Sequence, residues 1–552
     1  MAAIYYHPEA YTTTSPKLMG RNAAGESFLR GFITHSLSNE FCAYVHEPEH
    51  GKHFVETVRS FGRIESVRCL DKNTIGELSQ ANVLYYPGPG IGRQAFLRSA
   101  HGHGSWSLCG ITHTTSSALA MDDLTALISS PVQPWDALIC TSNAVKNNVT
   151  NLLQAQVDFL KDRLGVTKLT LPQFPVIPLG IHTSDFEISQ KQKYEARKKL
   201  AVGMGDLVVL FMGRLSFHAK AHPLAMYLAL ESASKRTGKK VVLIECGWHA
   251  NDFIKSSFSE AAKLACPSVQ VVTLDGRIAA ERQKAWAVAD VFCSLSDNIQ
   301  ETFGITPIEA MAAGLPVVVS DWDGYKDTVR DGIDGFRIQT LMPEAGLGKD
   351  LAFRHALEID SYDLYCGFTS ALIAVDVQAA ADAFVLLFDS CELRQKMGAS
   401  ARERARSVYD WKIIIGQYEE LWGNLNELRA MKSTEINSLK HPWPARMDPF
   451  FAFANYPTQT LTLDTNLKLN GTDIRIILKY VQNYQQLNMV KFAQMLLPTK
   501  EELNIVLEKA IKYPQGATAK DVISEIADSR KPYVLRSLVW LVKLGVLSVV
   551  KP

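Results

Sequence analysis

The stretch Glu301-Thr-Phe-Gly-Ile-Thr-Pro-Ile-Glu309-Ala-Met-Ala-Ala-Gly314-Leu-Pro-Val-Val-Val-Ser320 decides the fold. Its order of residue types predicts a loop, a short helix, a stop and a buried strand. Thr306 is predicted as the helix N-cap, with Pro307 in the first helical position and Glu309 three residues after the cap, the spacing of a capping box. Gly314 is predicted to end the helix. The backbone N–H groups ahead of the helix are then free to bind an anion.

Similar short apolar runs recur along the first 430 residues and alternate with longer helical patterns. The runs are continuous rather than alternating, which is typical of strands that are buried on both faces of a parallel sheet. The sequence therefore predicts an α/β fold with doubly wound sheets. The clearest runs are 83–86, 137–140, 207–212, 241–245, 269–274 and 317–320.

This number of strands is too large for a single open sheet. The proline-rich stretch 171–178 is a candidate boundary between two domains. We expect a Rossmann-like domain over 1–170, joined by a closing helix over 409–428, and a second such domain over 171–408. Ligands of such folds bind outside the carboxyl ends of the strands, so a site is expected in the cleft between the two domains. Residues 338–372 break the alternation and are predicted to be an insertion.

Composition and charge limit the class of protein. The 552 residues are 47% hydrophobic and 21% charged, which excludes a disordered or fibrous chain. Lys and Arg number 58 and Asp and Glu 57, so no chain-wide field suggests a nucleic-acid partner. The nine cysteines form no C-x-x-C pattern, which indicates a reducing compartment. Without a signal peptide or a run of eighteen apolar residues, a cytoplasmic location is expected.

The two glutamates eight positions apart carry a resemblance. The pattern E-x-F-G-I-x-x-x-E-A-M-A-A-G-x-P-V-V resembles the signature of family-4 retaining glycosyltransferases, which have the GT-B fold. The resemblance implies that Glu301 contacts a donor sugar and Glu309 the ribose of its nucleotide. It also implies that the amides of Phe303, Gly304 and Ile305 approach the sugar and phosphates.

A second segment agrees with this resemblance. Gly213 and Arg214 follow a predicted strand, and Lys220 comes six residues after Arg214. An Arg and a Lys together can bind a diphosphate, although each alone is more often a solvated charge at a strand end. The family places both on the donor diphosphate. The family often has a glycine directly after this lysine, whereas this chain has Ala, His and Pro after Lys220. The difference can change where the next helix begins.

The N-terminal half resembles the family less closely. Gly25 lies in a predicted glycine-bearing turn ahead of an apolar helix that starts near Phe28, similar to the family's phosphate-binding glycine loop. His113 follows a predicted strand, like the family's histidine beside the donor sugar. His101, His103 and His113 match no metal-binding spacing, so no metal is expected.

The region 430–552 differs from the rest, with 16 Lys and Arg against 10 Asp and Glu. Three predicted helices and a final strand resemble a small winged-helix module. Arg536, Trp540 and Lys543 share one helix face. A nucleic-acid contact is one interpretation; the modest charge favours a protein partner, homo-oligomerisation or association with a membrane surface instead.

The predicted function is retaining transfer of a sugar from a UDP or GDP sugar to a glycan, lipid or small-molecule acceptor, in polysaccharide or glycolipid biosynthesis and without a cofactor. The alternatives are a sugar-phosphate synthase or phosphorylase-like enzyme, and a non-catalytic sugar-nucleotide-binding regulator whose C-terminal region binds a nucleic acid or a partner. The predicted catalytic residues are His113, Arg214, Lys220 and Glu301, and the predicted donor-binding residues are Gly25, Gly213, Arg214, Lys220, Phe303, Gly304, Ile305 and Glu309.

Overall fold

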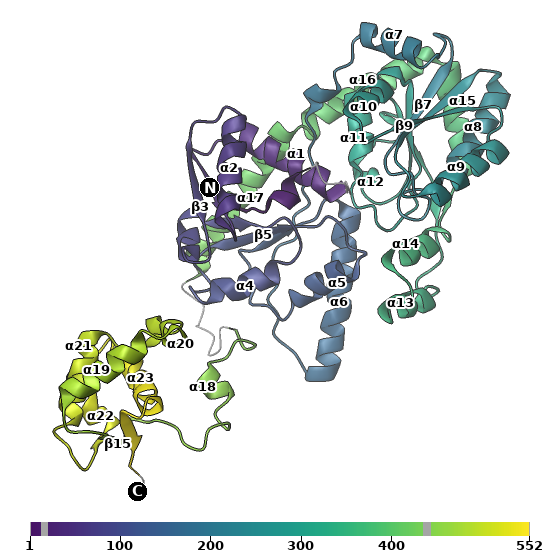
Figure 1. The fold of residues 1–552 in the computed structure, drawn as a ribbon. Coiled ribbons are helices and arrows are strands. Elements are labelled where there is room, and N and C mark those ends of the chain that lie inside the picture. Colours follow the sequence, from purple (N-terminus) through teal and green to yellow (C-terminus); the bar gives the residue numbers. More distant parts are fainter. Residues whose placement is uncertain (1, 13–19, 434–442, 551–552) are drawn as a thin grey trace. The chain divides into compact units, whose positions relative to one another are not determined.

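The computed structural model describes residues 2–12, 20–433 and 443–550, and the chain forms two compact units, Met1–Pro442 and Trp443–Pro552 (Figure 1). We call them unit 1 and unit 2. Over the described ranges, none of the helices is both long and apolar enough to cross a membrane.

The first half of unit 1 is a six-stranded parallel sheet in the order β3-β2-β1-β4-β5-β6. Its strands are β1 (Ala2–Tyr5), β2 (Glu40–Tyr44), β3 (Ser66–Leu70), β4 (Val83–Tyr85), β5 (Ser107–Ile111) and β6 (Ala137–Ile139). The helices between them are η1 (Pro8–Tyr11), α1 (Gly20–His35), α2 (Pro48–Ser60), η2 (Ile75–Glu77), α3 (Leu78–Ala81), α4 (Ile91–Ser99), α5 (Ala118–Ala126) and α6 (Asn143–Leu164).

The second half of unit 1 repeats this topology, with a six-stranded parallel sheet in the order β9-β8-β7-β10-β11-β12. Both sheets therefore have the Rossmann order 3-2-1-4-5-6, and the predicted fold class is confirmed. The strands are β7 (Leu207–Met212), β8 (Val241–Gly247), β9 (Gln270–Asp275), β10 (Val291–Ser294), β11 (Val317–Ser320) and β12 (Gly335–Ile338). The helices are η3 (Thr183–Phe186), α7 (Gln190–Lys199), α8 (Leu224–Thr237), α9 (Asp252–Ala265), α10 (Ala279–Val288), α11 (Ile305–Ala312), α12 (Tyr325–Thr328), α15 (Val377–Asp389) and α16 (Cys391–Val408).

Helix α17 (Trp411–Lys432) returns the chain to the first sheet and packs against α1. Its first residue, Trp411, is completely buried and donates its indole N–H to Ser27 Oγ at 2.7 Å. A Cβ at Gly31 or at Gly180 would come within 2.6 Å of the Trp411 ring. These two glycines therefore make the space in which the ring joins α1, α17 and the segment that connects the two sheets.

The predicted insertion is a separate excursion from the second sheet. Strand β13 (Thr340–Leu341) pairs antiparallel with β14 (Ala374–Val375), so the chain leaves and returns at one point. Between them lie α13 (Lys349–Ala356) and α14 (Tyr362–Ser370).

Unit 2 is mostly helical around a three-stranded antiparallel sheet in the order β16-β15-β17. Its buried cluster includes Leu503, Leu507, Val534 and Leu538, so the unit has a hydrophobic core of its own. The elements are α18 (Pro449–Ala452), β15 (Asn466–Leu469), α19 (Ile474–Gln485), α20 (Asn488–Lys491), η5 (Gln494–Leu496), α21 (Lys500–Ala510), β16 (Ala517–Thr518), α22 (Ala519–Val522), α23 (Lys531–Lys543) and β17 (Leu547–Val549).

A buried ion pair holds the first sheet to its helices. Arg98 of α4 donates to both carboxylate oxygens of Asp136, at 2.6 and 2.8 Å, and both side chains are completely buried. Asp136 also accepts from the backbone N–H groups of Leu108 in β5 and Gln133. The carboxylate thus fixes the start of β6 beside β5.

Replacing Arg98 with Leu leaves the Asp136 charge buried and unpaired, which should destabilise the protein by about 3–5 kcal/mol. The measurement is urea unfolding followed by tryptophan fluorescence. The control, Arg236→Leu, removes an exposed pair with Asp382 and should cost about 1 kcal/mol or less. Equal losses in the two variants would contradict the account of this pair.

Candidate functional site

The loop after β7 begins the site. Gly213 directly follows the strand with a φ of +152°, a conformation that favours glycine. The next residue, Arg214, donates to Ala219 O at 2.8 Å and to Gln300 Oε1 at 2.7 Å. Since Gln300 belongs to the loop after β10, the Arg214 guanidinium joins the carboxyl ends of two neighbouring strands.

Lys220 and Glu301 form an ion pair between the same two loops, with Lys220 Nζ donating to Glu301 Oε2. Burial raises the pKa of Glu301, but the Lys220 ammonium and the N–H groups of Thr302 and Phe303 outweigh it, so the pKa lies below its usual value. Glu301 is therefore ionised at neutral pH. An anionic ligand that contacts Lys220 competes with this carboxylate for the ammonium.

Helix α11 begins earlier than the sequence predicts, and the expected capping box is wrong. Its N-cap is Gly304, with a φ of +81° and no capping side chain. Thr306 lies within the first turn, and its buried Oγ1 has no hydrogen-bond partner among the described residues. Tertiary packing decides the start, because a Cβ on Gly304 would lie 2.0 Å from the Tyr325 ring. The N–H groups of the first turn need partners from outside the helix.

Glu309 lies on α11, facing the same region without a partner of its own. In the described part of the chain, its carboxylate makes no ion pair and accepts no side-chain or backbone hydrogen bond. Burial raises its pKa to about 7, although the charges of Arg282 and Lys220 partly offset this. Without a capping role, Glu309 is a half-buried carboxyl group that is available to a ligand hydroxyl.

Residues of the first Rossmann-like domain also form hydrogen bonds to the loop after β10. Thr302 Oγ1 donates to the backbone carbonyl of His113 at 3.0 Å, and Ser142 Oγ lies 2.9 Å from Thr302 O, to which it donates. His113 follows β5 by two residues, and Ser142 caps α6. The structure thus places the backbone of His113 next to Thr302, the residue that follows Glu301.

Gly25 does not lie in a turn, which corrects that prediction. Helix α1 already starts at Gly20, so Gly25 is inside it. A Cβ at this position would come within 2.1 Å of the carbonyl oxygen of Ala10 in η1. Packing of η1 on α1 accounts for this glycine.

Tyr362 is a site residue that sequence reasoning missed. It is the first residue of α14 in the insertion, and its hydroxyl accepts from Gln300 Nε2 at 3.0 Å. The same hydroxyl lies 3.0 Å from Ser116 Oγ, just after β5. A chain of hydrogen bonds therefore runs from Arg214 through Gln300 and Tyr362 to Ser116. No signal in the sequence marked Tyr362, because it stands outside the repeating pattern of strands and helices.

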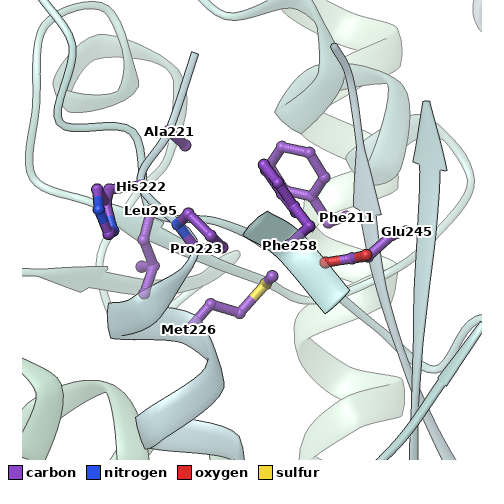
Figure 2. A pocket seen from close by; sticks show the side chains of 8 residues that line it. All are labelled: Phe211, Ala221, His222, Pro223, Met226, Glu245, Phe258 and Leu295. Atoms are coloured by element: carbon purple, nitrogen blue, oxygen red, sulfur yellow. The ribbon is translucent and has the colours of Figure 1, made fainter. Parts of the chain in front are cut away.

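A small pocket is lined by residues of the loop after β7 and of the start of α8, among others (Figure 2). Burial raises the pKa of its one carboxyl group, Glu245, to about 7, despite a hydrogen bond from the Tyr227 hydroxyl at 2.5 Å. The backbone N–H of His222, another lining residue, donates to Asp297 at 3.2 Å. The lining residues are mainly apolar: Phe211, Ala221, His222, Pro223, Met226, Glu245, Phe258 and Leu295. Such a lining is better suited to packing that supports the loop than to binding a charged ligand.

Comparison with known proteins agrees with the site. Residues 192–345 match the family model of the glycosyl transferases group 1. This segment holds Arg214, Lys220, Glu301 and Glu309, so the predicted resemblance is confirmed for this part of the chain. Over the described ranges, no three His, Cys, Asp or Glu side chains gather as a metal site.

Curated relatives match only part of their length. A phosphatidyl-myo-inositol mannosyltransferase of Mycobacterium leprae is 34% identical over 139 residues, which are 25% of this chain and 27% of that protein. An alpha-monoglucosyldiacylglycerol synthase of Streptococcus pneumoniae is 32% identical over 189 residues, 33% of this chain and 37% of that protein. An uncharacterized glycosyltransferase of Methanocaldococcus jannaschii is 25% identical over 258 residues, 46% of this chain and 59% of that protein. In each case the match spans less than two thirds of the relative.

A solved structure resembles the chain more weakly. The sucrose-phosphate synthase of Thermosynechococcus elongatus is 15% identical, with a TM-score of 0.46 over 77% of this chain and 99% of that one. The fold assignment rests instead on the strand orders of the two sheets.

The raised pKa of Glu309 predicts a pH-dependent effect of Glu309→Gln. In the folded state this carboxyl ionises only near pH 7, so its contribution is favourable at acidic pH and is lost as pH rises through about 7. Gln does not ionise. The melting temperature of the variant relative to the unchanged protein should therefore increase between about pH 5.5 and about pH 8.5.

Thermal melts at the two pH values measure this shift. Glu260→Gln on the exposed surface of α9 is the control and should show the same small offset at both. A pH-independent offset for Glu309→Gln would contradict a Glu309 carboxyl with a raised pKa.

Proposed function

We propose that the chain is a retaining glycosyltransferase that transfers a sugar from a nucleoside-diphosphate sugar to an acceptor hydroxyl. The observation that carries this proposal is the convergence of Arg214, Lys220 and Glu301 at the carboxyl ends of β7 and β10. The match of residues 192–345 to the glycosyl transferases group 1 supports it.

In this proposal the donor diphosphate binds to Arg214 and Lys220. A guanidinium and an ammonium supply charge-assisted hydrogen bonds, which are stronger than neutral ones. The diphosphate replaces Glu301 as the partner of Lys220 and frees the carboxylate to accept hydrogen bonds from hydroxyls of the sugar. Glu309 accepts from the ribose, and the N–H groups at the start of α11 point to the sugar and phosphates.

The transfer itself proceeds on one face of the sugar. The bond between the anomeric carbon and the diphosphate oxygen breaks, and the acceptor oxygen forms the new bond from the same side. The departing phosphate oxygen takes the acceptor proton, so the products are the glycoside and the nucleoside diphosphate. Arg214, Lys220 and backbone N–H groups stabilise the charge that develops on the leaving group. In this proposal the His113 side chain contacts the sugar from the first domain.

The acceptor is proposed to be a lipid or a glycan, and the donor a UDP or GDP sugar. One relative is named a phosphatidyl-myo-inositol mannosyltransferase and another an alpha-monoglucosyldiacylglycerol synthase. Both names contain a lipid, which supports a role in glycolipid assembly. No metal or organic cofactor is part of the proposed chemistry.

Activity is tested by incubating the full chain with UDP and GDP sugars and a panel of lipid and oligosaccharide acceptors. Mass spectrometry should detect an acceptor that has gained one sugar, together with free nucleoside diphosphate. Tight nucleotide binding without turnover for any pair would favour the regulator over the enzyme.

Removing either donor-binding cation should weaken nucleotide binding. In Arg214→Ala and Lys220→Ala, loss of one charge-assisted contact costs about 1.5–3 kcal/mol, or about ten- to a hundredfold in Kd. Isothermal calorimetry with UDP and GDP measures this change. The control, Arg277→Ala, removes an exposed arginine just after β9 at the same edge of the sheet and should bind as before. Unchanged affinity in both test variants would remove these residues from the site.

Tyr362→Phe should weaken donor binding through Arg214 without touching the ligand. Loss of the hydroxyl frees Gln300 and so loosens Arg214, and we expect a rise of a few-fold in the KM for the donor. Steady-state kinetics at saturating acceptor measure it. Tyr365→Phe is a matched control on the same helix, where the ring stacks on His355. An equal change in both variants would show that the insertion acts only through its stability.

A further inference from the structure

Unit 2 exposes several large apolar side chains in the segment between the start of α19 and the start of α21. Phe492 and Met495 are 92% and 91% exposed, which is rare for side chains of this size. The full set lies within residues 474–500, which we name the basic-apolar surface: Ile476, Tyr480, Leu487, Met489, Phe492, Met495 and Leu496, all at least 41% exposed.

These side chains are not needed for the core of unit 2. Helix α19 already buries Ile477 and Val481 on its inner face, while Ile476 and Tyr480 on the other side stay exposed. The following turns, α20 and η5, bury no residue at all. Folding of unit 2 therefore leaves this apolar area without a partner.

The charges of the same segment have one sign. Residues 474–500 contain Arg475, Lys479, Lys491 and Lys500 and no Asp or Glu. All four side chains are exposed. Among the described residues, Arg475 pairs with its neighbour Asp473, and the three lysines form no ion pair. The positive charges are thus available to an external anion.

The insertion of unit 1 offers an internal contrast. It too exposes apolar side chains, among them Phe353 at 64% and Leu357 at 54%. Residues 341–372, however, contain five Asp and Glu against two Lys and Arg. Apolar exposure and positive charge therefore coincide on the basic-apolar surface and not on the insertion.

We propose that the basic-apolar surface docks unit 2 on a bilayer that contains anionic lipids. Apolar side chains enter the interface while neighbouring lysines extend their ammonium groups to the headgroups. Lysine is depleted from protein–protein interfaces, which makes a protein partner a poorer fit. The proposal goes beyond the sugar transfer and does not depend on it, because it concerns residues outside the donor site.

Vesicle co-sedimentation of the full chain tests this proposal. Vesicles of phosphatidylcholine with phosphatidylglycerol should bind the protein at least tenfold more tightly than vesicles of phosphatidylcholine alone. Phe492→Ser with Met495→Ser should reduce binding at least tenfold, and Lys479→Glu with Lys491→Glu should abolish the preference for the anionic lipid.

Matched controls change other exposed positions, all of them in unit 1. Phe253→Ser with Leu264→Ser, which are 68% and 86% exposed on α9, should bind vesicles like the unchanged protein. Lys198→Glu with Lys199→Glu, both exposed on α7, should do the same. Circular dichroism of each variant checks that it is folded.

Three results would overturn the proposal. The first is absence of binding to anionic vesicles. The second is binding that the Phe492 and Met495 substitutions leave unchanged in a folded protein. The third is a dimer, detected by light scattering, that dissociates in the Phe492 and Met495 variant, combined with an unchanged protein that does not bind vesicles. The basic-apolar surface would then be an interface with a second copy of the chain.

Discussion

The salt bridge between Lys220 and Glu301 is the interaction on which the proposed site depends. It joins the loops that follow β7 and β10, which are neighbours at the point where the strand order reverses. Opposite charges that lie close together in a partly buried site stay ionised, and the pKa of Glu301 is correspondingly low. Before a ligand binds, the loop is therefore already folded around a cation and an anion.

The first domain contributes to the same loop through a polar residue rather than an apolar contact. Thr302 receives a hydrogen bond from Ser142 and donates one to the His113 carbonyl. A shift of the first domain would pull on the residue directly after Glu301. Tyr362 makes a similar connection from the insertion, since its hydroxyl bonds both to Gln300 and to Ser116. Both contacts couple the position of the proposed donor loop to the first domain.

Much of this arrangement could be predicted from the sequence, because buried parallel strands leave a periodicity that is independent of their partners. The run over 207–212 became β7 without change. The spacing of Glu301 and Glu309 carried the family resemblance, and the structure places Glu301 in the loop after β10 and Glu309 on α11.

Other features depend on tertiary contacts that leave no local pattern. Thr306 and Pro307 favour a helix start that the structure does not use. Tyr325 packs against Gly304, and the helix begins at the earlier residue Ile305. Gly25 looks like a loop glycine but is required by a carbonyl of η1. Tyr362 could not be found, because its partners are separated from it by 62 and 246 residues.

The stereochemistry of the product tests the central claim most directly. Proton NMR of the reaction with an α-linked nucleoside-diphosphate sugar should show an anomeric proton with the coupling of an α-glycoside, and the signal should be absent with Glu301→Gln. A β-linked product, or an α-linked product formed equally well by Glu301→Gln, would contradict a one-face transfer at the ends of β7 and β10.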